Sequence, residues 1–165
     1  PIGSAGSTDK LTGLRTRPAF PSLMDRLLAE YERQARPVSM LLLDLDHFKH
    51  VNDQHGHATG DRALCHVAAQ LQQGLRKSDI AVRWGGEEFL VLARATHRDD
   101  AKVVAERIRR TVGGRSFIRP DGTALPKPRS IGFACCPLFP GAPRCAAGWH
   151  VWGRADTCLC LGTPS

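Results

Sequence analysis

The sequence predicts an α+β sandwich, in which helices cover a mostly antiparallel central sheet. Residues 38–45 are almost all apolar, which is typical of a strand that is buried on both faces of a sheet. Two more strand-like runs, 79–84 and 89–93, flank Gly85 and Gly86. Because glycine adopts the positive φ angles of tight turns, these runs predict a β-hairpin. Helical patterns elsewhere in the chain supply the covering layers.

The N-terminal part predicts a turn followed by an amphipathic helix. Residues 1–8 are rich in Gly and Ser, which indicates a linker, and residues 9–14 indicate a compact turn. Pro18 suits the first turn of a helix that extends to about Ala35. The apolar stripe of this helix consists of Phe20, Leu23, Met24, Leu27, Leu28 and Tyr31.

The later elements complete the order β-α-α-β-β-α-(β)-β, with the hairpin in the middle. Asp99 or Asp100 is expected to cap the helix that follows the hairpin. The expected elements outside the hairpin are helices over about 47–53, 59–75 and 99–112, a turn at 120–122 and a last central strand at 130–134.

The composition is that of an ordinary globular protein. The 165 residues suffice for one domain, and 42% of them are hydrophobic. No apolar run approaches the ~20 residues that cross a bilayer, and no signal peptide is recognisable. We therefore expect a cytoplasmic protein, or the cytoplasmic part of a membrane-anchored one.

The formal charge of +7 permits a polyanionic partner. The basic residues are scattered, however, and Arg107, Arg109 and Arg110 are expected on a solvated helix face. We therefore expect no DNA or RNA partner.

The six cysteines do not indicate a metal site. Five of them fall in the last 31 residues, and neither paired CxxC motifs nor a CxxC followed by a His pair is present. Cys65 lies in a helical pattern and is expected to be a small core residue. We expect the thiols to be reduced.

Acidic residues stand at two predicted strand ends. Asp44 ends the first apolar run, and Glu87 and Glu88 follow the glycine turn. In the predicted sheet these carboxylates converge on one edge, where oxygen ligands can hold a hard divalent cation together with waters and substrate phosphates. Two simpler interpretations stay open. Asp44 can be a turn residue or helix cap, and the glutamates can be solvated turn residues.

The segment Arg83-Trp84-Gly85-Gly86-Glu87-Glu88-Phe89 resembles the signature of the GGDEF family, the diguanylate cyclases. The resemblance covers about residues 9–135. It includes residues 9–14, residues 44–53, Gly56-His57, Gly60-Asp61 and residues 130–134.

This resemblance implies a palm-like, nucleotidyl-cyclase-like fold over residues 9–143. It implies that two GTP molecules condense to cyclic di-GMP and release two pyrophosphates. Each subunit of a homodimer is expected to hold one GTP, with two Mg²⁺ or Mn²⁺ ions per active half-site. A sensory domain is expected in the full-length protein.

The resemblance also implies roles for single residues at the acidic edge. Asp44, Glu87 and Glu88 correspond to metal ligands, and the carbonyl of Leu45 lies nearby. Glu87 and Glu88 are the expected catalytic residues, with Glu88 either a metal ligand or the base for the attacking 3′-hydroxyl. The metals can lower the pKa of that hydroxyl and neutralise charge on the phosphoryl oxygens.

Two further groups of residues are implied to bind GTP. Asn52 and Asp61 match the guanine-binding pair, since a carboxylate that accepts from N1–H and the 2-amino group selects guanine over adenine. Without the resemblance, Asn52 is a turn residue and Asp61 a helix cap. His47, Phe48 and Lys49 match the helix start whose backbone amides cradle the phosphates.

Arg76 and Asp79 match the RxxD pattern of the family's inhibitory site, which binds the product cyclic di-GMP. Arg83 is expected in the same site. The planar fork of arginine suits both phosphate and the Hoogsteen edge of guanine. The alternative is an exposed ion pair at a helix end.

Residues 144–165 form an atypical tail. The resemblance implies a final helix with a Lys and an Arg that hold the triphosphate. Residues 155–159 match the start of this helix, but residues 160–165 contain neither Lys nor Arg. We therefore expect impaired turnover. The alternative function is a weak or inactive receptor module that holds GTP or cyclic di-GMP.

Overall fold

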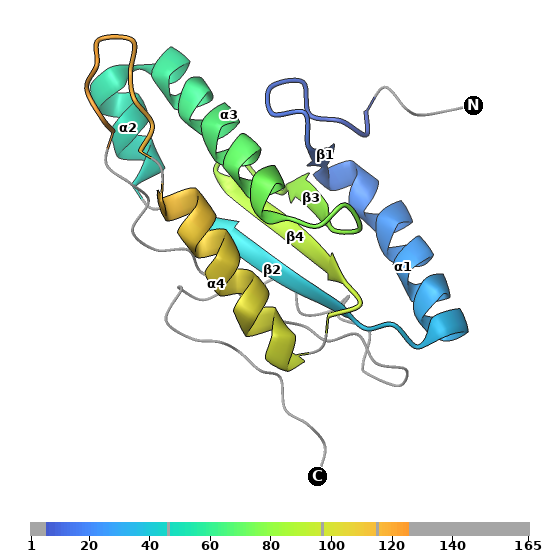
Figure 1. The fold of residues 1–165 in the computed structure, drawn as a ribbon. Coiled ribbons are helices and arrows are strands. Elements are labelled where there is room, and N and C mark those ends of the chain that lie inside the picture. The colour runs from blue at the N-terminus through green and yellow to red at the C-terminus, as the bar shows by residue number, and fades with distance from the viewer. Residues whose placement is uncertain (1–5, 46, 97, 115, 126–165) are drawn as a thin grey trace.

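The computed structural model describes residues 6–45, 47–96, 98–114 and 116–125. Within these residues the strands form one sheet, with helices on both of its faces (Figure 1). The strands are β1 (Arg15–Thr16), β2 (Val38–Asp44), β3 (Ile80–Arg83) and β4 (Glu88–Arg94). The α-helices are α1 (Phe20–Gln34), α2 (Phe48–His55), α3 (His57–Gly74) and α4 (Arg98–Gly114), and a 3-10 turn, η1 (Arg17–Ala19), leads into α1.

The strand order in the sheet is β1-β3-β4-β2. Strand β4 pairs antiparallel with β2 and with β3, whereas β1 pairs parallel with β3. The register places Asp44 opposite Glu88 and Arg83 opposite Phe89. The predicted hairpin and the α+β class with a mostly antiparallel sheet are confirmed.

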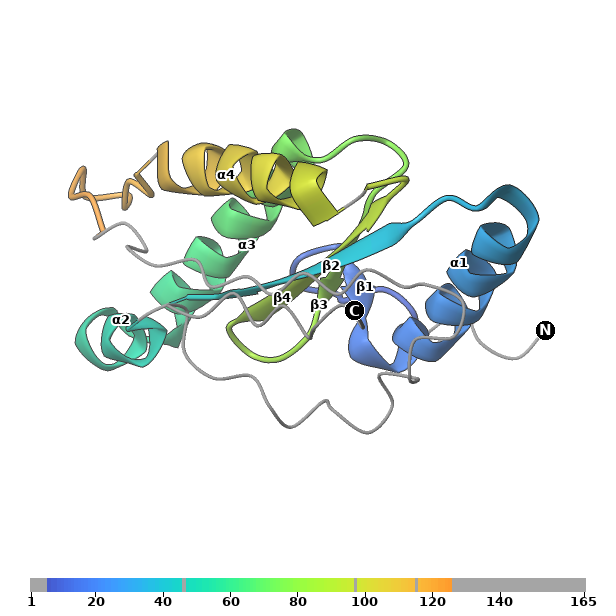
Figure 2. The ribbon, with the colours of Figure 1, turned by 90° about the horizontal axis from the view of Figure 1, so that it is seen from below.

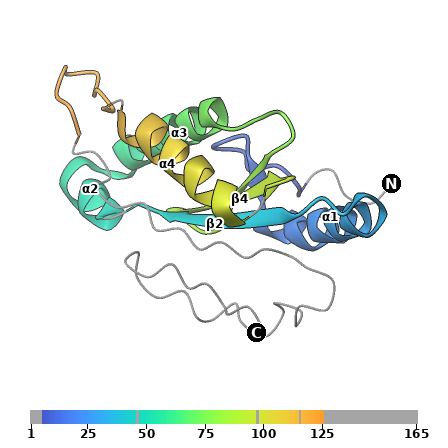
Figure 3. The same ribbon diagram turned by 60° about the horizontal axis from the view of Figure 1, so that its bottom comes forward.

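Strands β2 and β4 are buried on both faces, as their apolar runs predict. Alternate side chains enter two separate cores because successive residues of a strand point to opposite faces. Figures 2 and 3 show α3 and α4 over one face of the sheet and α1 against the other. The first core contains Leu41, Leu43, Phe89 and Val91, and the second contains Met40, Leu90 and Leu92.

Helices α2 and α3 are separated by Gly56 alone. Its φ of 83° is a conformation that glycine adopts without steric cost, so the chain turns sharply between the two helices. The predicted break is confirmed, although it occupies less chain than expected. Three residues separate the end of β2 from the start of α2, which sets the start of α2 next to the end of the sheet.

Several local expectations differ from the structure. The cap expected at Asp99 or Asp100 is wrong, because α4 begins at Arg98 and takes both aspartates into its first turn. Acidic residues are favourable there as well, through the helix dipole. Cys65 is half-buried rather than in the core, and its thiol contacts the Leu11 carbonyl at 3.2 Å. The turn at 120–122 is present, closed by a bridge between Ile118 and Ala124.

Some expectations concern the ends of the chain. Ser7 and Thr8, assigned to a linker by composition, pair with the strand that follows, since the Thr16 N–H donates to the Ser7 carbonyl at 3.0 Å. The expected strand at 130–134 and the tail at 144–165 lie outside the described residues. Among the described helices, none is long and apolar enough to span a bilayer.

Candidate active site

The acidic residues meet where β2 ends and β4 begins. Asp44 lies opposite Glu88 in the register, and the Leu45 N–H donates to the Glu87 carbonyl at 3.2 Å. On the other side, the N–H groups of Trp84 and Gly85 donate to the Glu88 carbonyl at 2.8 and 3.2 Å. The hairpin therefore holds both glutamates beside the end of β2, as the sequence predicts.

These carboxylates repel one another. Burial raises the pKa of Glu87 above its ordinary value, and the charges of Asp44 and Glu88 raise it further. Asp44 is exposed, while both glutamates are half-buried. Such a concentration of negative charge favours a bound metal ion.

The oxygen donors at this edge fit Mg²⁺ or Mn²⁺. Asp44, Glu87 and Glu88 offer carboxylates, and the Leu45 carbonyl receives a long contact of 3.4 Å from the Phe48 N–H. Within the described ranges, no group of three or more His, Cys, Asp and Glu side chains could enclose a metal by itself. Water and substrate phosphates would have to complete the octahedron, which is the usual arrangement for Mg²⁺.

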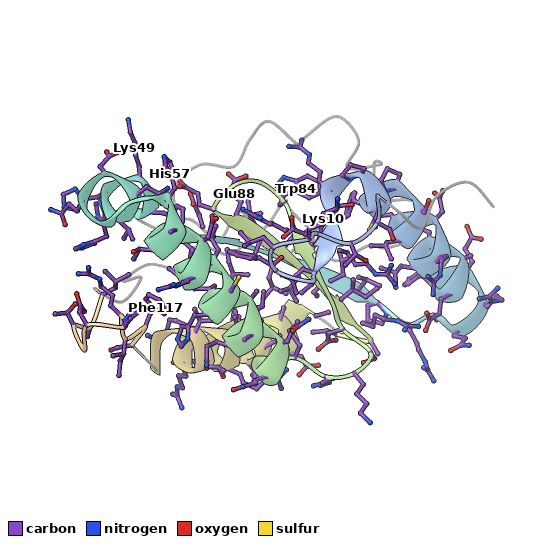
Figure 4. The ribbon with its side chains drawn as sticks, turned by 90° about the horizontal axis from the view of Figure 1, so that it is seen from above. Lys10, Lys49, His57, Trp84, Glu88 and Phe117 are labelled. Carbon is purple, nitrogen blue, oxygen red and sulfur yellow. The ribbon has the colours of Figure 1, made fainter. Side chains whose placement is uncertain are left out.

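Gly85 makes room for one of these carboxylates. A Cβ at this position would lie 2.7 Å from Oε2 of Glu88. That distance is too short for a real Cβ, so the first glycine of the turn leaves the space that the Glu88 carboxylate occupies. Figure 4 shows Glu88 between the loop with Trp84 and the corner with Lys49 and His57.

The start of α2 borders the acidic edge. His47 has a left-handed φ of 62°, and no side chain among the described residues caps the helix. His47 and Lys49 are exposed, whereas Phe48 is buried. The first turn of α2 can therefore present backbone N–H groups to an anion, as expected for a phosphate-binding segment.

The predicted guanine-binding pair lies across the α2–α3 corner. Asn52 on α2 packs so closely on Gly60 of α3 that a Cβ at Gly60 would lie 1.8 Å from Asn52 Oδ1. Asp61 is the next residue of α3, and its side chain is exposed. It borders an open hollow that Leu11 and Phe117 also line. The structure thus brings Asn52 to the residue that precedes Asp61.

Arg76 and Asp79 form a tight turn between α3 and β3. The Asp79 carboxylate accepts from the Arg76 N–H at 3.0 Å and from the Arg94 N–H at 3.2 Å. The Arg76 side chain is exposed. Asp79 therefore fixes the backbone of the RxxD turn and leaves the Arg76 guanidinium at the surface.

The structure does not bring Arg83 to this turn. It lies four residues beyond Asp79, about 13 Å along the strand at ~3.3 Å per residue. Its guanidinium pairs with Asp9 at 3.1 Å and donates to the Gly86 carbonyl at 3.1 Å. Arg83 thus joins the N-terminal turn to the loop that carries Glu87.

Arg107 was expected on a solvated face, and this is wrong. Arg109 and Arg110 are indeed exposed and pair with Glu106. Arg107 instead donates through Nε to the Gly74 carbonyl at 2.8 Å, and its Nη2 is buried without a hydrogen-bond partner among the described residues. Gly74 lies two residues before Arg76, so an unsatisfied guanidinium N–H stands beside the RxxD turn. No sequence spacing indicates this contact, because α4 and the end of α3 meet only in the fold.

The model of one protein family, described as "Diguanylate cyclase, GGDEF domain", matches residues 6–142. Diguanylate cyclase DgcP of Pseudomonas aeruginosa is 38% identical over 152 residues, which are 92% of this chain and 22% of that protein. Response regulator PleD of Caulobacter vibrioides is 43% identical over 118 residues, 72% of this chain and 26% of that protein. The chain therefore spans about a quarter of the length of these relatives.

Solved structures of the same kind share the fold. The crystal structure of the GGDEF domain of DgcB from Caulobacter crescentus, in complex with c-di-GMP, superposes with a TM-score of 0.72 at 33% identity. The match covers 82% of this chain and 81% of that one. Together with the family match and the placement of the Gly-Gly-Glu-Glu-Phe turn at the acidic sheet edge, these likenesses show that the chain belongs to the GGDEF domain family of diguanylate cyclases.

Proposed function

We propose that this domain condenses two GTP molecules into cyclic di-GMP. In each of two equivalent steps, the 3′-oxygen of one GTP bonds to the α-phosphorus of the other, pyrophosphate leaves, and the hydroxyl proton passes to a base. The observation that carries the proposal is the meeting of Asp44, Glu87 and Glu88 at one sheet edge, beside the uncapped start of α2.

The carboxylates of Asp44 and Glu87 and the carbonyl of Leu45 are the proposed ligands of Mg²⁺ or Mn²⁺, two ions per active half-site. A bound metal lowers the pKa of the 3′-hydroxyl and neutralises charge on the phosphoryl oxygens. Glu88 either binds metal or accepts the proton. The Glu88 side chain lies against Gly85, and this contact would orient the carboxylate in either role.

The other residues of the site bind and orient GTP. Asp61, with its exposed carboxylate, accepts from guanine N1–H and the 2-amino group, and Asn52 completes the guanine contacts. The N–H groups that open α2, at His47, Phe48 and Lys49, hold the phosphates. Because each subunit supplies one GTP, catalysis needs two copies of this domain face to face.

Arg76 and Asp79 are proposed to bind the product, away from the acidic edge. Arg107 is added to this product site, because its buried Nη2 lacks a hydrogen-bond partner next to the turn. An acceptor on a ligand would satisfy that donor. Arg83 is assigned instead to the hairpin, where it binds Asp9 and Gly86.

A receptor module that binds GTP or cyclic di-GMP without turnover is the second candidate. It is favoured by one sequence observation, which is that residues 157–165 contain no Lys or Arg where the family resemblance expects them. In the full-length protein we expect a sensory domain and a cytoplasmic location for this one, since GTP is its substrate.

Incubation with GTP and Mg²⁺, followed by chromatography for cyclic di-GMP, distinguishes the two candidates. The cyclase proposal expects product from the wild type and none from Glu87→Gln. Absence of product from a wild-type domain that binds GTP in a Mg²⁺-dependent way would instead support the receptor. A domain that does not convert GTP and binds neither GTP nor cyclic di-GMP would contradict both.

A further inference from the structure

Gly60 is buried at the point where α3 touches α2. A Cβ placed on it would lie 1.8 Å from Oδ1 and 2.9 Å from Cγ of Asn52. Contacts below 3.0 Å are essentially never made by a real Cβ. The Asn52 amide therefore occupies the space that any side chain at position 60 would need.

The same glycine also supports the start of α2. Phe48 and Asn52 are four residues apart, so they lie on one face of α2, which is the face toward α3. The Cζ atom of Phe48 would be 3.1 Å from the added Cβ. Gly60 thus lies against both the Asn52 amide, which is proposed to bind guanine, and the Phe48 ring at the start of α2.

The close approach is built into the turn between the helices. Gly56 is the one residue between α2 and α3, and the Gly60 N–H donates to its carbonyl at 3.2 Å. The connection is too short to let the two helices separate. A methyl group at position 60 must therefore move the Asn52 side chain, because the backbone on both sides is fixed.

We propose that Gly60 is a specificity-determining position for the nucleotide base. By leaving its Cβ space empty, it lets the Asn52 amide lie against α3, next to Asp61, in the orientation that contacts guanine. This inference rests on the proposed GTP binding. Gly60 itself is a positioning residue, since it acts through the Asn52 side chain.

The test is the affinity of the domain for GTP and for ATP, measured by calorimetry with Mg²⁺. Gly60→Ala is expected to weaken GTP binding by roughly tenfold, the worth of one or two lost hydrogen bonds, and to leave ATP binding unchanged. The control is Gly113→Ala in α4, where an added Cβ meets nothing within 4 Å. It should bind both nucleotides as the wild type does.

A double variant separates positioning from general damage. Asn52→Ala removes the side chain that collides, so Asn52→Ala/Gly60→Ala should bind GTP as weakly as Asn52→Ala alone. The double variant also tests the proposal if Gly60→Ala alone does not fold. A double variant that binds GTP more weakly than Asn52→Ala, or that fails to fold, would overturn the proposal.

Two other results would also overturn it. The first is unchanged GTP affinity in Gly60→Ala. The second is an equal loss for GTP and ATP, because that would place the effect on the phosphates through Phe48. A wild type that shows no preference for GTP over ATP would refute the proposed function itself, and is recognised before any variant is made.

Discussion

At the scale of single residues, the charges at the acidic edge destabilise the folded state when no metal is bound. Glu87 carries a raised pKa because it is partly buried and faces the charges of Asp44 and Glu88. Glu106, on the surface of α4, is the opposite case. Hydrogen bonds from Arg109 and Arg110 lower its pKa to about 2. The neighbours of Glu87 destabilise its charged form, whereas the neighbours of Glu106 stabilise its charged form.

The first prediction concerns Glu87→Gln. The substitution removes one of three repelling charges and keeps the shape of the side chain. We expect the melting temperature without metal at pH 7 to rise by roughly 1–3 °C, while cyclic di-GMP synthesis is lost. Glu106→Gln is the control, and it should not raise the melting temperature. A lower melting temperature in Glu87→Gln would show that the carboxylate stabilises the fold.

The second prediction concerns pH. A carboxyl whose pKa is raised in the folded state binds its proton more tightly there than in the unfolded chain. Without metal, Glu87 therefore contributes stability at pH below its raised pKa, and this contribution is lost as the pH rises through that value. Bound Mg²⁺ offsets the repulsion between Glu87 and the charges of Asp44 and Glu88. The stabilisation of the fold by Mg²⁺ should therefore be larger at pH 7 than at pH 5. Thermal unfolding with and without Mg²⁺ measures this difference, which should shrink in Glu87→Gln.

At the scale of elements, the N-terminal turn is joined to the hairpin that carries Glu87. Burial raises the pKa of Asp9, but hydrogen bonds from Thr12 and Arg83 outweigh it and leave the pKa below 3.8. Asp9 is therefore ionised at neutral pH and pairs with Arg83, which also donates to the Gly86 carbonyl. The turn thus helps to fix the residue that precedes Glu87.

The third prediction is that Asp9→Asn loosens this hairpin. We expect about 1–2 kcal/mol less unfolding free energy, because a charge-assisted hydrogen bond is lost, and weaker Mg²⁺-dependent GTP binding. The Asp9 contribution is present above pH 3.8 and is lost as the pH falls through its lowered pKa. Denaturant unfolding and calorimetry measure the two effects.

Asp121→Asn is a matched control. Asp121 also accepts from a nearby threonine and pairs with an arginine, Arg119, but this pair lies in the turn at 120–122 rather than at the hairpin. Asp121→Asn should leave the Mg²⁺ dependence of GTP binding unchanged. Equal effects of the two substitutions on GTP binding would refute a special role for the Asp9–Arg83 pair.

Elements with a strong local pattern were predictable from the sequence. Strand β2 and the hairpin follow from apolar runs and a glycine turn, and the break at Gly56 follows from its turn residues. Strand β1 was missed because two residues carry no periodicity, and their pairing with β3 depends on the tertiary fold.

The same distinction holds for the candidate site. Asp44 and Glu87 could be placed together because the strand order follows from the hairpin. The partner of Arg83 is Asp9, 74 residues away, and the partner of Arg107 is Gly74 on another helix. No spacing in the sequence encodes such contacts. The close approach of Asn52 to Gly60 is likewise visible only in the fold.

At the scale of the whole molecule, the proposed product site and the acidic edge lie at opposite ends of β3. The fourth prediction is that Arg107→Ala and Arg76→Ala each weaken cyclic di-GMP binding by roughly tenfold or more, since each removes charge-assisted hydrogen bonds. Calorimetry with cyclic di-GMP measures this. GTP binding should be unaffected.

Arg109→Ala provides the control for that prediction. Arg109 is two residues from Arg107 on the same helix, but it is exposed and pairs with Glu106. Cyclic di-GMP should bind this variant as it binds the wild type. An Arg107→Ala variant with unchanged product affinity would remove Arg107 from the site and leave its buried N–H unexplained.

The central claim is that the edge formed by β2 and β4 binds the metal of a GTP complex. The most direct measurement is the affinity for GTP with Mg²⁺ and with EDTA, in the wild type and in Asp44→Asn. The wild type is expected to bind GTP at least roughly tenfold more tightly with Mg²⁺, and Asp44→Asn to lose most of that gain because one ligand is removed. An Asp44→Asn variant that keeps the full Mg²⁺ dependence would contradict the account.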